Sequence, residues 1–318
     1  MASHKKFKIK DFPKLLWEAA KIWNANDPFR LGAVVAYYAV LSLPGLLLII
    51  INLVGFIWGE EIVQGQITEQ ITEAIGKSAA DSVVTIIDNS QTDGRTVFAS
   101  IIGIAVLIFG STGVFYHLQI SMNEIWHVKV NPDVGFWKVL RDRAMSLAFV
   151  MAIAFLLIVS FVVSTALTFL TGYLSNIWEP AYVIVAQSAE FLLTTLILGF
   201  LFVAIFRYMP DMKIKWNTVW LGGFMTAILF NLGKILLSFY FGKSEPGSVY
   251  GAAGSVILLL LWVSYSCLIL FYGAAFCRVY AETYGSKTHP NEYAMVVSEK
   301  EVIVEKGKPE KEEKSESG

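Results

Sequence analysis

The sequence predicts an all-α, polytopic membrane protein with six transmembrane helices and further amphipathic helices at and outside the membrane. First, 55% of its residues are hydrophobic and only 16% are charged, whereas about a quarter are charged in ordinary soluble domains. Second, six charge-poor runs exceed the roughly 20 residues needed to cross a hydrocarbon layer of about 30 Å. Third, Lys and Arg collect in alternate loops. The runs are Leu31–Trp58, Thr96–Gln119, Ala144–Thr171, Ala181–Phe206, Trp216–Phe241 and Val249–Cys277.

The distribution of Lys and Arg predicts that both termini are cytoplasmic, because basic loops stay on the cytoplasmic side. Basic residues precede the first run and follow the second, fourth and sixth, whereas the opposite loops hold only Lys77, Arg95 and Lys243. No cleavable signal peptide is visible before the first run. The predicted organisation is a cytoplasmic segment 1–30, a six-helix membrane domain 31–285 and a cytoplasmic tail 286–318.

The segment before the first run is predicted to form an amphipathic helix in the membrane interface. Asp11-Phe12-Pro13 is typical of a helix start with Pro in the first turn, and apolar residues recur at helical spacing as far as Trp23. Lys14 and other basic residues there would favour anionic headgroups. The alternative is a cytoplasmic helix that binds a partner protein.

Residues 59–95 form a long external stretch between the first two runs. Ile and Val repeat there at three- and four-residue intervals, which predicts one or two amphipathic helices outside the bilayer. Their apolar face is expected to cap the bundle or rest in the outer leaflet, and the alternative is a lid or gate. At the other end of the chain, Lys and Glu dominate from Ser298 onward, and the tail 286–318 is predicted to be disordered.

Two ionisable residues lie inside the predicted spans, where charge is costly and indicates either function or pairing. Counted from the external ends, Glu190 lies about nine residues (roughly 13 Å) inside the fourth run, and Lys234 about seven residues (roughly 10 Å) inside the fifth. Because these depths are similar, the two could form a buried pair that lowers the desolvation cost of each. A structural pair and a part in a substrate or proton path both stay open.

Pro44 interrupts the first run near its middle and leaves a carbonyl without its helical donor. Ser42 could satisfy the freed carbonyl, or the broken helix could line a cavity. Asn52, Asn123 and Asn231 add hydrogen-bonding groups at helix ends and interfaces. Bonding between helices is the structural interpretation of these residues, and a substrate path is the functional one.

Composition and spacing argue against several classes of function. The net charge of −1 and the dispersal of basic residues along the loops disfavour nucleic-acid binding. The four His have no ligand spacing with one another or with Cys, and no Ser–His–Asp set can be assembled, so no catalytic residue, metal ligand or cofactor is expected. Cys267 and Cys277 lie in the last run and are expected to be packing residues.

Five short strings carry a resemblance to a known family: AYYAVLSLP at 36–44, NEIW at 123–126, RYMP at 207–210, Gly233-Lys234, and YGAAG at 250–254. In this order and at these places relative to the runs, they resemble the YihY/BrkB family of bacterial inner-membrane proteins, also labelled ribonuclease BN-like. The resemblance extends from about Lys14 to Tyr284. It departs at Pro44, one residue earlier than in the family's Ser-Leu-x-Pro, and at Phe276, where relatives often carry a glutamate.

The resemblance implies an envelope-related role in the bacterial inner membrane. The leading hypothesis is a transporter or flippase-like protein for a lipid or other amphiphile, with membrane lipids and envelope proteins as partners. The alternative is a non-transporting membrane scaffold of an envelope complex. An enzyme is not expected, because RNA hydrolysis would need a metal–carboxylate or acid–base cluster that the sequence does not supply.

Overall fold

The computed structural model describes residues 8–42, 113–130, 181–244, 254–284, 288–291 and 294–296, with single positions between 59 and 84 and between 141 and 155. Its helices are η1 (Ile9–Asp11), α1 (Phe12–Ala25), an apolar helix Pro28–Ser42, a helix at 113–125, α7 (Ala181–Tyr208), α8 (Trp216–Ser244) and α9 (Gly254–Tyr284). Its strands are β1 (Val128–Val130), β2 (Met212–Lys213), β3 (His289–Pro290) and β4 (Ala294–Val296).

Helices α7, α8 and α9 coincide with the last three predicted spans. The segments Phe191–Tyr208, Trp216–Leu237 and Val256–Tyr284 are long and apolar enough to cross a membrane. Part of the first predicted span lies in the described helix Pro28–Ser42, and part of the second lies in the helix 113–125. The described positions of the third span are helical. The remainder of those three spans lies outside the described residues, so the structure establishes three candidate spans of the six.

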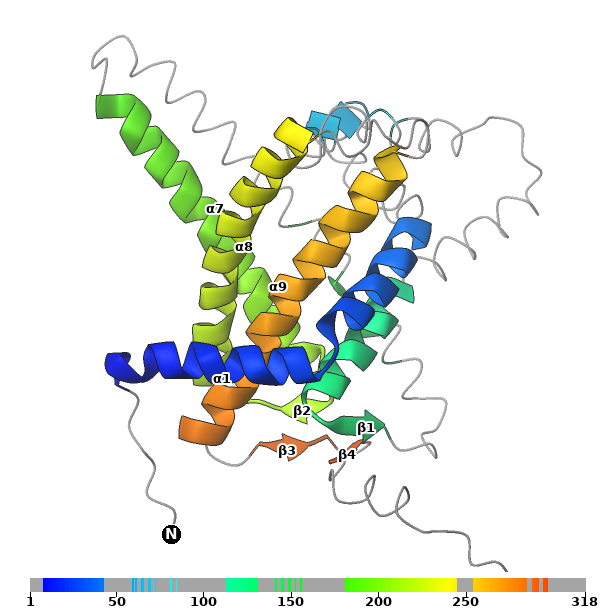
Figure 1. Ribbon diagram of the computed structural model, residues 1–318, viewed down its shortest axis with the longest axis vertical. Coiled ribbons are helices and arrows are strands. Elements are labelled where there is room, and N and C mark those ends of the chain that lie inside the picture. Colours follow the sequence, from blue (N-terminus) through cyan, green and yellow to red (C-terminus); the bar gives the residue numbers. More distant parts are fainter. Residues whose placement is uncertain are drawn as a thin grey trace, which may run out of the picture.

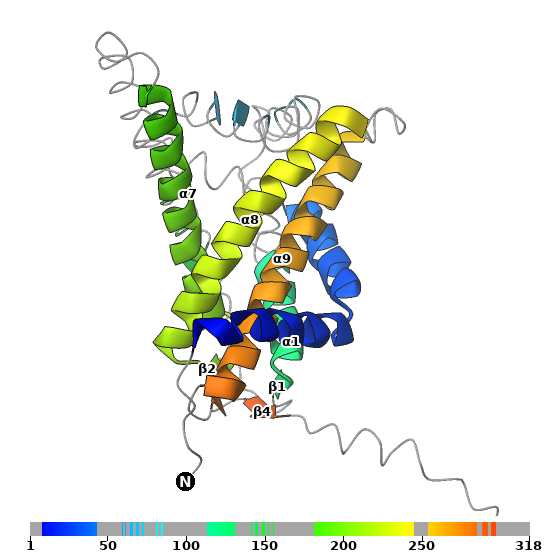
Figure 2. The same cartoon turned by 60° about the vertical axis from the view of Figure 1, so that its left-hand side comes forward.

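Small residues on α8 let it approach both neighbouring helices closely. A Cβ added at Gly223 would lie 2.8 Å from the backbone nitrogen of Val203 on α7, and one at Gly222 would overlap the sulfur of Cys277 on α9. Such contacts bring the helix backbones together, as small residues do in membrane bundles. The three helices pack together at the lower end of Figure 1, and α7 and α8 diverge toward the upper end in Figures 1 and 2.

The amphipathic helix predicted near the N-terminus is present as α1, which lies across the lower part of α9 (Figure 1). Leu15 and Ala19 are buried in a cluster with Phe276 and Val279 of α9. The apolar face of α1 is therefore covered by the bundle itself. A position in the membrane interface stays a prediction.

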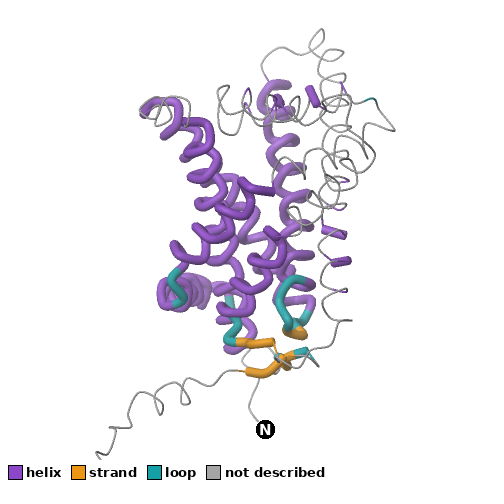
Figure 3. The backbone as a smooth tube through the Cα atoms, turned by 90° about the vertical axis from the view of Figure 1, so that its right-hand side faces the viewer, coloured by secondary structure: helices purple, strands orange, loops and turns teal. Residues whose placement is uncertain are grey.

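Four short strands gather at the lower end of the molecule (Figure 3). They form two antiparallel pairs, β1 with β4 and β2 with β3. The described fold is thus mostly helical with a small amount of β-structure. β3 and β4 lie within the predicted tail 286–318, and disorder of the other tail residues stays a prediction. The backbone groups following 113–125 and α7 need partners once those helices end, and β3 and β4 supply them.

The external stretch 59–95 is described only at separate positions, and all of these but Gly59 are helical. The hydroxyl of Thr68 donates to the Gln64 carbonyl at 2.8 Å, and that of Thr72 to the Thr68 carbonyl at 2.8 Å. Both are bonds to the residue four positions earlier, as in a helix. The described positions thus agree with the predicted helices, whereas their place outside the bilayer stays a prediction.

Candidate functional site

A buried carboxylate, that of Asp211, is the centre of a polar cluster at the lower end of the bundle. Asp211 is 1% exposed and follows the end of α7. Its Oδ2 accepts hydrogen bonds from Asn123 Nδ2 at 2.9 Å and Gln119 Nε2 at 3.2 Å. Asn123 Oδ1 in turn accepts the backbone N–H of Asp211 at 2.8 Å. The side chain of Asn123 therefore hydrogen-bonds both the carboxylate and the backbone N–H of Asp211.

Two further chain segments meet at the same aspartate. Arg141 Nη2 lies 3.9 Å from Asp211 Oδ1, and the backbone N–H of Asn291, beside β3, donates to the Asp211 carbonyl at 3.0 Å. The Arg141 side chain is half-exposed while the carboxylate is buried. A buried charge needs both hydrogen bonds and a partner of opposite sign, and the cluster supplies both.

The local sequence explains why the chain bends at this point. Gln119 and Asn123 lie four residues apart and so share one face of helix 113–125. Met209 and Pro210 are buried directly before Asp211, which fixes the turn out of α7. Arg207, in the last turn of α7, reaches across this bend. Its guanidinium donates to the Ile214 carbonyl and lies 5.4 Å from the Trp216 ring centre. The link between α7 and α8 is thus held at both of its ends.

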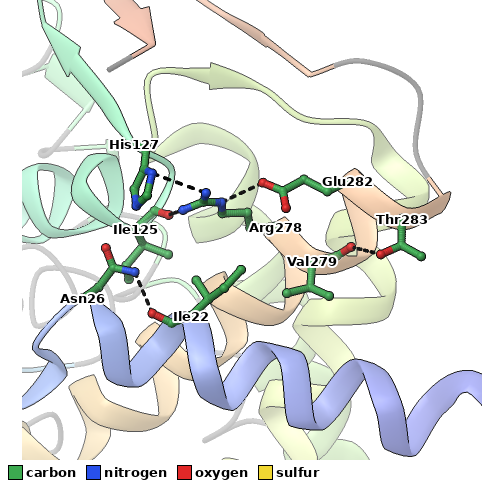
Figure 4. Close-up of polar contacts among 8 residues, drawn as sticks. All are labelled: Ile22, Asn26, Ile125, His127, Arg278, Val279, Glu282 and Thr283. Atoms are coloured by element: carbon green, nitrogen blue, oxygen red, sulfur yellow. Dashed lines mark hydrogen bonds and ion pairs between the residues drawn. The ribbon is translucent and has the colours of Figure 1, made fainter. Parts of the chain in front are cut away.

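Arg278 of α9 contacts the C-terminal end of helix 113–125 (Figure 4). Its Nη1 donates to the Ile125 carbonyl at 2.7 Å, its Nη2 lies 3.4 Å from His127 Nδ1, and its Nε donates to Glu282 at 2.8 Å. A cation at this position satisfies a free carbonyl and complements the helix dipole. Helix 113–125 is therefore joined to α9 by Arg278 as well as to the α7–α8 link by Asp211.

A second polar contact joins α7 and α8 farther from the strands. Asn231 Nδ2 donates to Thr195 Oγ1 at 2.8 Å, and both residues are buried. Three residues along α8, Lys234 is exposed. Gly233, between them, packs against α9, because a Cβ there would lie 2.6 Å from the Tyr265 hydroxyl. Within one turn of α8, therefore, Asn231 contacts α7, Gly233 packs against α9, and Lys234 is exposed.

The chain is similar to a known protein family, and two of the sequence strings that resemble this family lie in the Asp211 cluster. A family model described as "Virulence factor BrkB" matches residues 19–295. The chain belongs to the BrkB family. Two of the family-like strings, NEIW at 123–126 and RYMP at 207–210, lie at the contact between Asn123 and Asp211.

Several proteins similar to this chain are named as membrane proteins. A UPF0761 membrane protein of Haemophilus influenzae strain 86-028NP is 24% identical over 84% of this chain and 93% of its own length. One of Aggregatibacter aphrophilus is 22% identical over 87% of this chain and 95% of its own length. A longer one of Albidiferax ferrireducens is 26% identical over 54% of this chain and 39% of its own length. No solved structure matches the chain.

The structure separates the predicted site residues. Asn123 belongs to the Asp211 cluster and Asn231 to the α7–α8 contact. Ser42 is buried and its hydroxyl donates to the Ala39 carbonyl at 3.2 Å, whereas the carbonyl that Pro44 leaves without a donor is that of Val40. Pro44, Asn52 and the side chain of Glu190 lie outside the described residues, so the Glu190–Lys234 pair stays a prediction.

Asp211 and Arg141 were not among the residues predicted from the sequence. A signal was present, since Asp211 is the single acidic residue among Arg207, Lys213 and Lys215 in a short basic loop. It follows the string RYMP at 207–210 directly. An isolated carboxylate in such a loop, next to a family-like string, indicates a specific partner rather than solvation.

Proposed function

We propose that this member of the BrkB family is a flippase-like transporter of a lipid or other amphiphile of the cell envelope. It would lie in the bacterial inner membrane with both termini in the cytoplasm. Membrane lipids would be its substrates, and envelope proteins its further partners. The proposal assigns it no enzymatic activity, no cofactor and no nucleic-acid partner.

The observation that carries the proposal is the surface around Lys234. Lys234 and the nearby apolar residues of α8, Leu232, Ile235 and Leu236, are all exposed. A cation on an apolar surface matches an amphiphile with an anionic headgroup, since charge attracts the headgroup while the apolar residues contact its chains. Lys234 lies within the candidate span Trp216–Leu237, where a charged side chain is costly and indicates function.

The packing of the helices supports the same proposal. The end that carries Asp211 is closely packed through Gly222 and Gly223, and α7 and α8 diverge toward the opposite end (Figure 2). With the predicted orientation, the packed end faces the cytoplasm. Movement of a substrate across the membrane would then require the contacts at Asp211 to open, as alternating access demands.

The test is lipid movement in vesicles that contain the purified full-length protein and a fluorescent phosphatidylglycerol. One lysine near an anionic headgroup contributes about 1 kcal/mol, or about fivefold. Lys234→Gln should therefore lower the rate about fivefold, whereas Lys234→Arg, which keeps the charge, should retain most of it. Lys129→Gln removes an exposed lysine from β1 and is the matched control. Equal rates for wild type and Lys234→Gln would contradict the proposed role of Lys234.

The predicted break at Pro44 gives a second test of transport. Backbone groups without helical partners persist in lipid only where protein or water shields them, so the break at Pro44 is expected to face inward. Pro44→Ala restores the missing helical donor. We expect membrane insertion and expression near wild type, together with strongly reduced lipid movement. Unchanged lipid movement would remove the break from the transport path.

A scaffold is the second candidate function, favoured by the number of segments that Asp211 joins. Helix 113–125, Arg141, the α7–α8 link and Asn291 meet there, and such a rigid end would suit a platform for an envelope complex. Absence of lipid movement in the wild-type protein across a broad lipid panel would favour this candidate over transport.

A further inference from the structure

The outward face of α1 carries a row of basic residues that neither the packing nor the proposed transport path uses. Lys14, Trp17 and Lys21 of α1 are spaced by three and four residues, which places them on one side of the helix, and Lys10 lies just before α1, in η1. All four are exposed. We name these four residues the basic stripe.

The position of the basic stripe is fixed by hydrogen bonds on the opposite side of α1. Trp23 Nε1 donates to the Leu268 carbonyl of α9 at 3.0 Å, and the hydroxyl of Tyr272 of α9 donates to the Leu16 carbonyl at 3.0 Å. At the other end of α1, the hydroxyl of Tyr284 donates to Asp11 Oδ2 at 2.7 Å. With Leu15 buried as well, α1 is held against α9 and cannot turn its basic stripe inward without breaking these contacts.

The contacts place α1 beside the C-terminal half of a candidate membrane span. Its partners Leu268, Tyr272 and Tyr284 all belong to that half of Val256–Tyr284. Trp17 is 65% exposed, and an exposed Trp at that level is typical of the aromatic belt at the membrane–water boundary. Lys21 Nζ lies 5.9 Å from the Trp17 ring centre and 3.0 Å from Glu18. The Lys21 side chain is 55% exposed, so a headgroup phosphate can reach its ammonium.

We infer that the basic stripe of α1 is a docking surface for anionic headgroups of the bilayer in which the protein sits. Lysines on a surface helix add about fivefold each to the attraction of an anionic lipid. The ring of Trp17 anchors the helix at the depth of the headgroups, and the lysine stems cover apolar surface while their ammonium groups reach the phosphates. This role is independent of transport, because it concerns lipid bound at the flank of α9 and not lipid moved between leaflets.

The first test measures lipid selectivity with spin-labelled phosphatidylglycerol and phosphatidylcholine in vesicles that contain the full-length protein. The variant carries Lys10→Gln, Lys14→Gln and Lys21→Gln together. Its control carries Lys129→Gln, Lys213→Gln and Lys215→Gln, which remove the same charge from exposed positions at the strands. Selectivity for phosphatidylglycerol should fall about threefold or more in the α1 variant and little in the control. Equal falls in both variants, or none in the α1 variant, would overturn the inference.

The second test measures depth and does not depend on charge. A nitroxide attached at Trp17→Cys, in a background without the two native cysteines, should collide with dissolved oxygen more than with a water-soluble nickel reagent. The same label at Lys129→Cys, exposed on β1, provides the aqueous reference. Matching nickel accessibility at both positions would place the basic stripe in water and overturn the bilayer assignment in favour of an acidic protein partner.

Discussion

Replacement of Asp211 by alanine should destabilise the protein by about 1–4 kcal/mol. The substitution removes the acceptor of Asn123 Nδ2, and Asn123 is 5% exposed. A buried donor left without an acceptor costs about 1–3 kcal/mol. Gln119 is only partly buried, so water can replace its lost bond. Loss of the attraction to the half-exposed Arg141 adds about 0–1 kcal/mol.

Asp211→Asn separates the effect of charge from that of hydrogen bonding. The amide keeps one side-chain oxygen, so Asn123 retains an acceptor and the expected cost falls to about 1 kcal/mol. Asp27→Asn is the control for the same chemical change. The Asp27 side chain is 75% exposed and its φ is 54°, a conformation that Asn tolerates, so the expected change is within about 0.5 kcal/mol.

The assay is thermal unfolding of the purified protein in nanodiscs, where about 1 kcal/mol corresponds to roughly 2–4 °C for large domains. Asp211→Ala should lower the apparent Tm by roughly 2–16 °C, and Asp211→Asn by roughly 2–4 °C. The double variant with Asn123→Ala should lose much less than the sum of the single losses, because both changes break the same bonds. Additive losses, or an Asp211→Ala protein as stable as Asp27→Asn, would refute the reasoning.

Three further predictions concern helix packing, the predicted ion pair and orientation. Gly222→Ala should cost about 1–3 kcal/mol in thermal unfolding, because the new methyl overlaps a cysteine of α9, whereas Gly65→Ala, with nothing within 4 Å, should be neutral or slightly stabilising. If Glu190 pairs with Lys234, either single apolar substitution should cost about 3–5 kcal/mol and the double one much less, and additive losses would exclude the contact. Lys138→Cys, in a background without native cysteines, should resist an impermeant thiol reagent on intact cells, and labelling from outside would reverse the topology.

How far the sequence predicts the structure depends on the range of the interaction. The helices α1, α7, α8 and α9 follow from local apolar periodicity and run length, and α7 and α8 begin at the predicted Ala181 and Trp216. The polar clusters depend on contacts between distant segments. Asn123 was selected for its hydrogen-bonding side chain, yet its partner Asp211 lies 88 residues away. The local spacing of apolar residues cannot predict a contact between segments so far apart in the sequence. The strand β4 was not predicted for the same reason, because it depends on its partner β1 rather than on its own composition.

The pairing of β1 with β4 sets an order for biogenesis. On a ribosome that adds about 5–20 residues per second, roughly 10–30 s pass between synthesis of Val128 and of its partner Val296. For that time β1 has an open edge on a chain whose hydrophobic helices are already entering the membrane, and β2 waits a shorter time for β3. The segment after α9 therefore completes the lower face of the molecule, so this face can fold only after α9 has been made. A stalled or prematurely terminated product would present both unpaired edges to quality-control proteases.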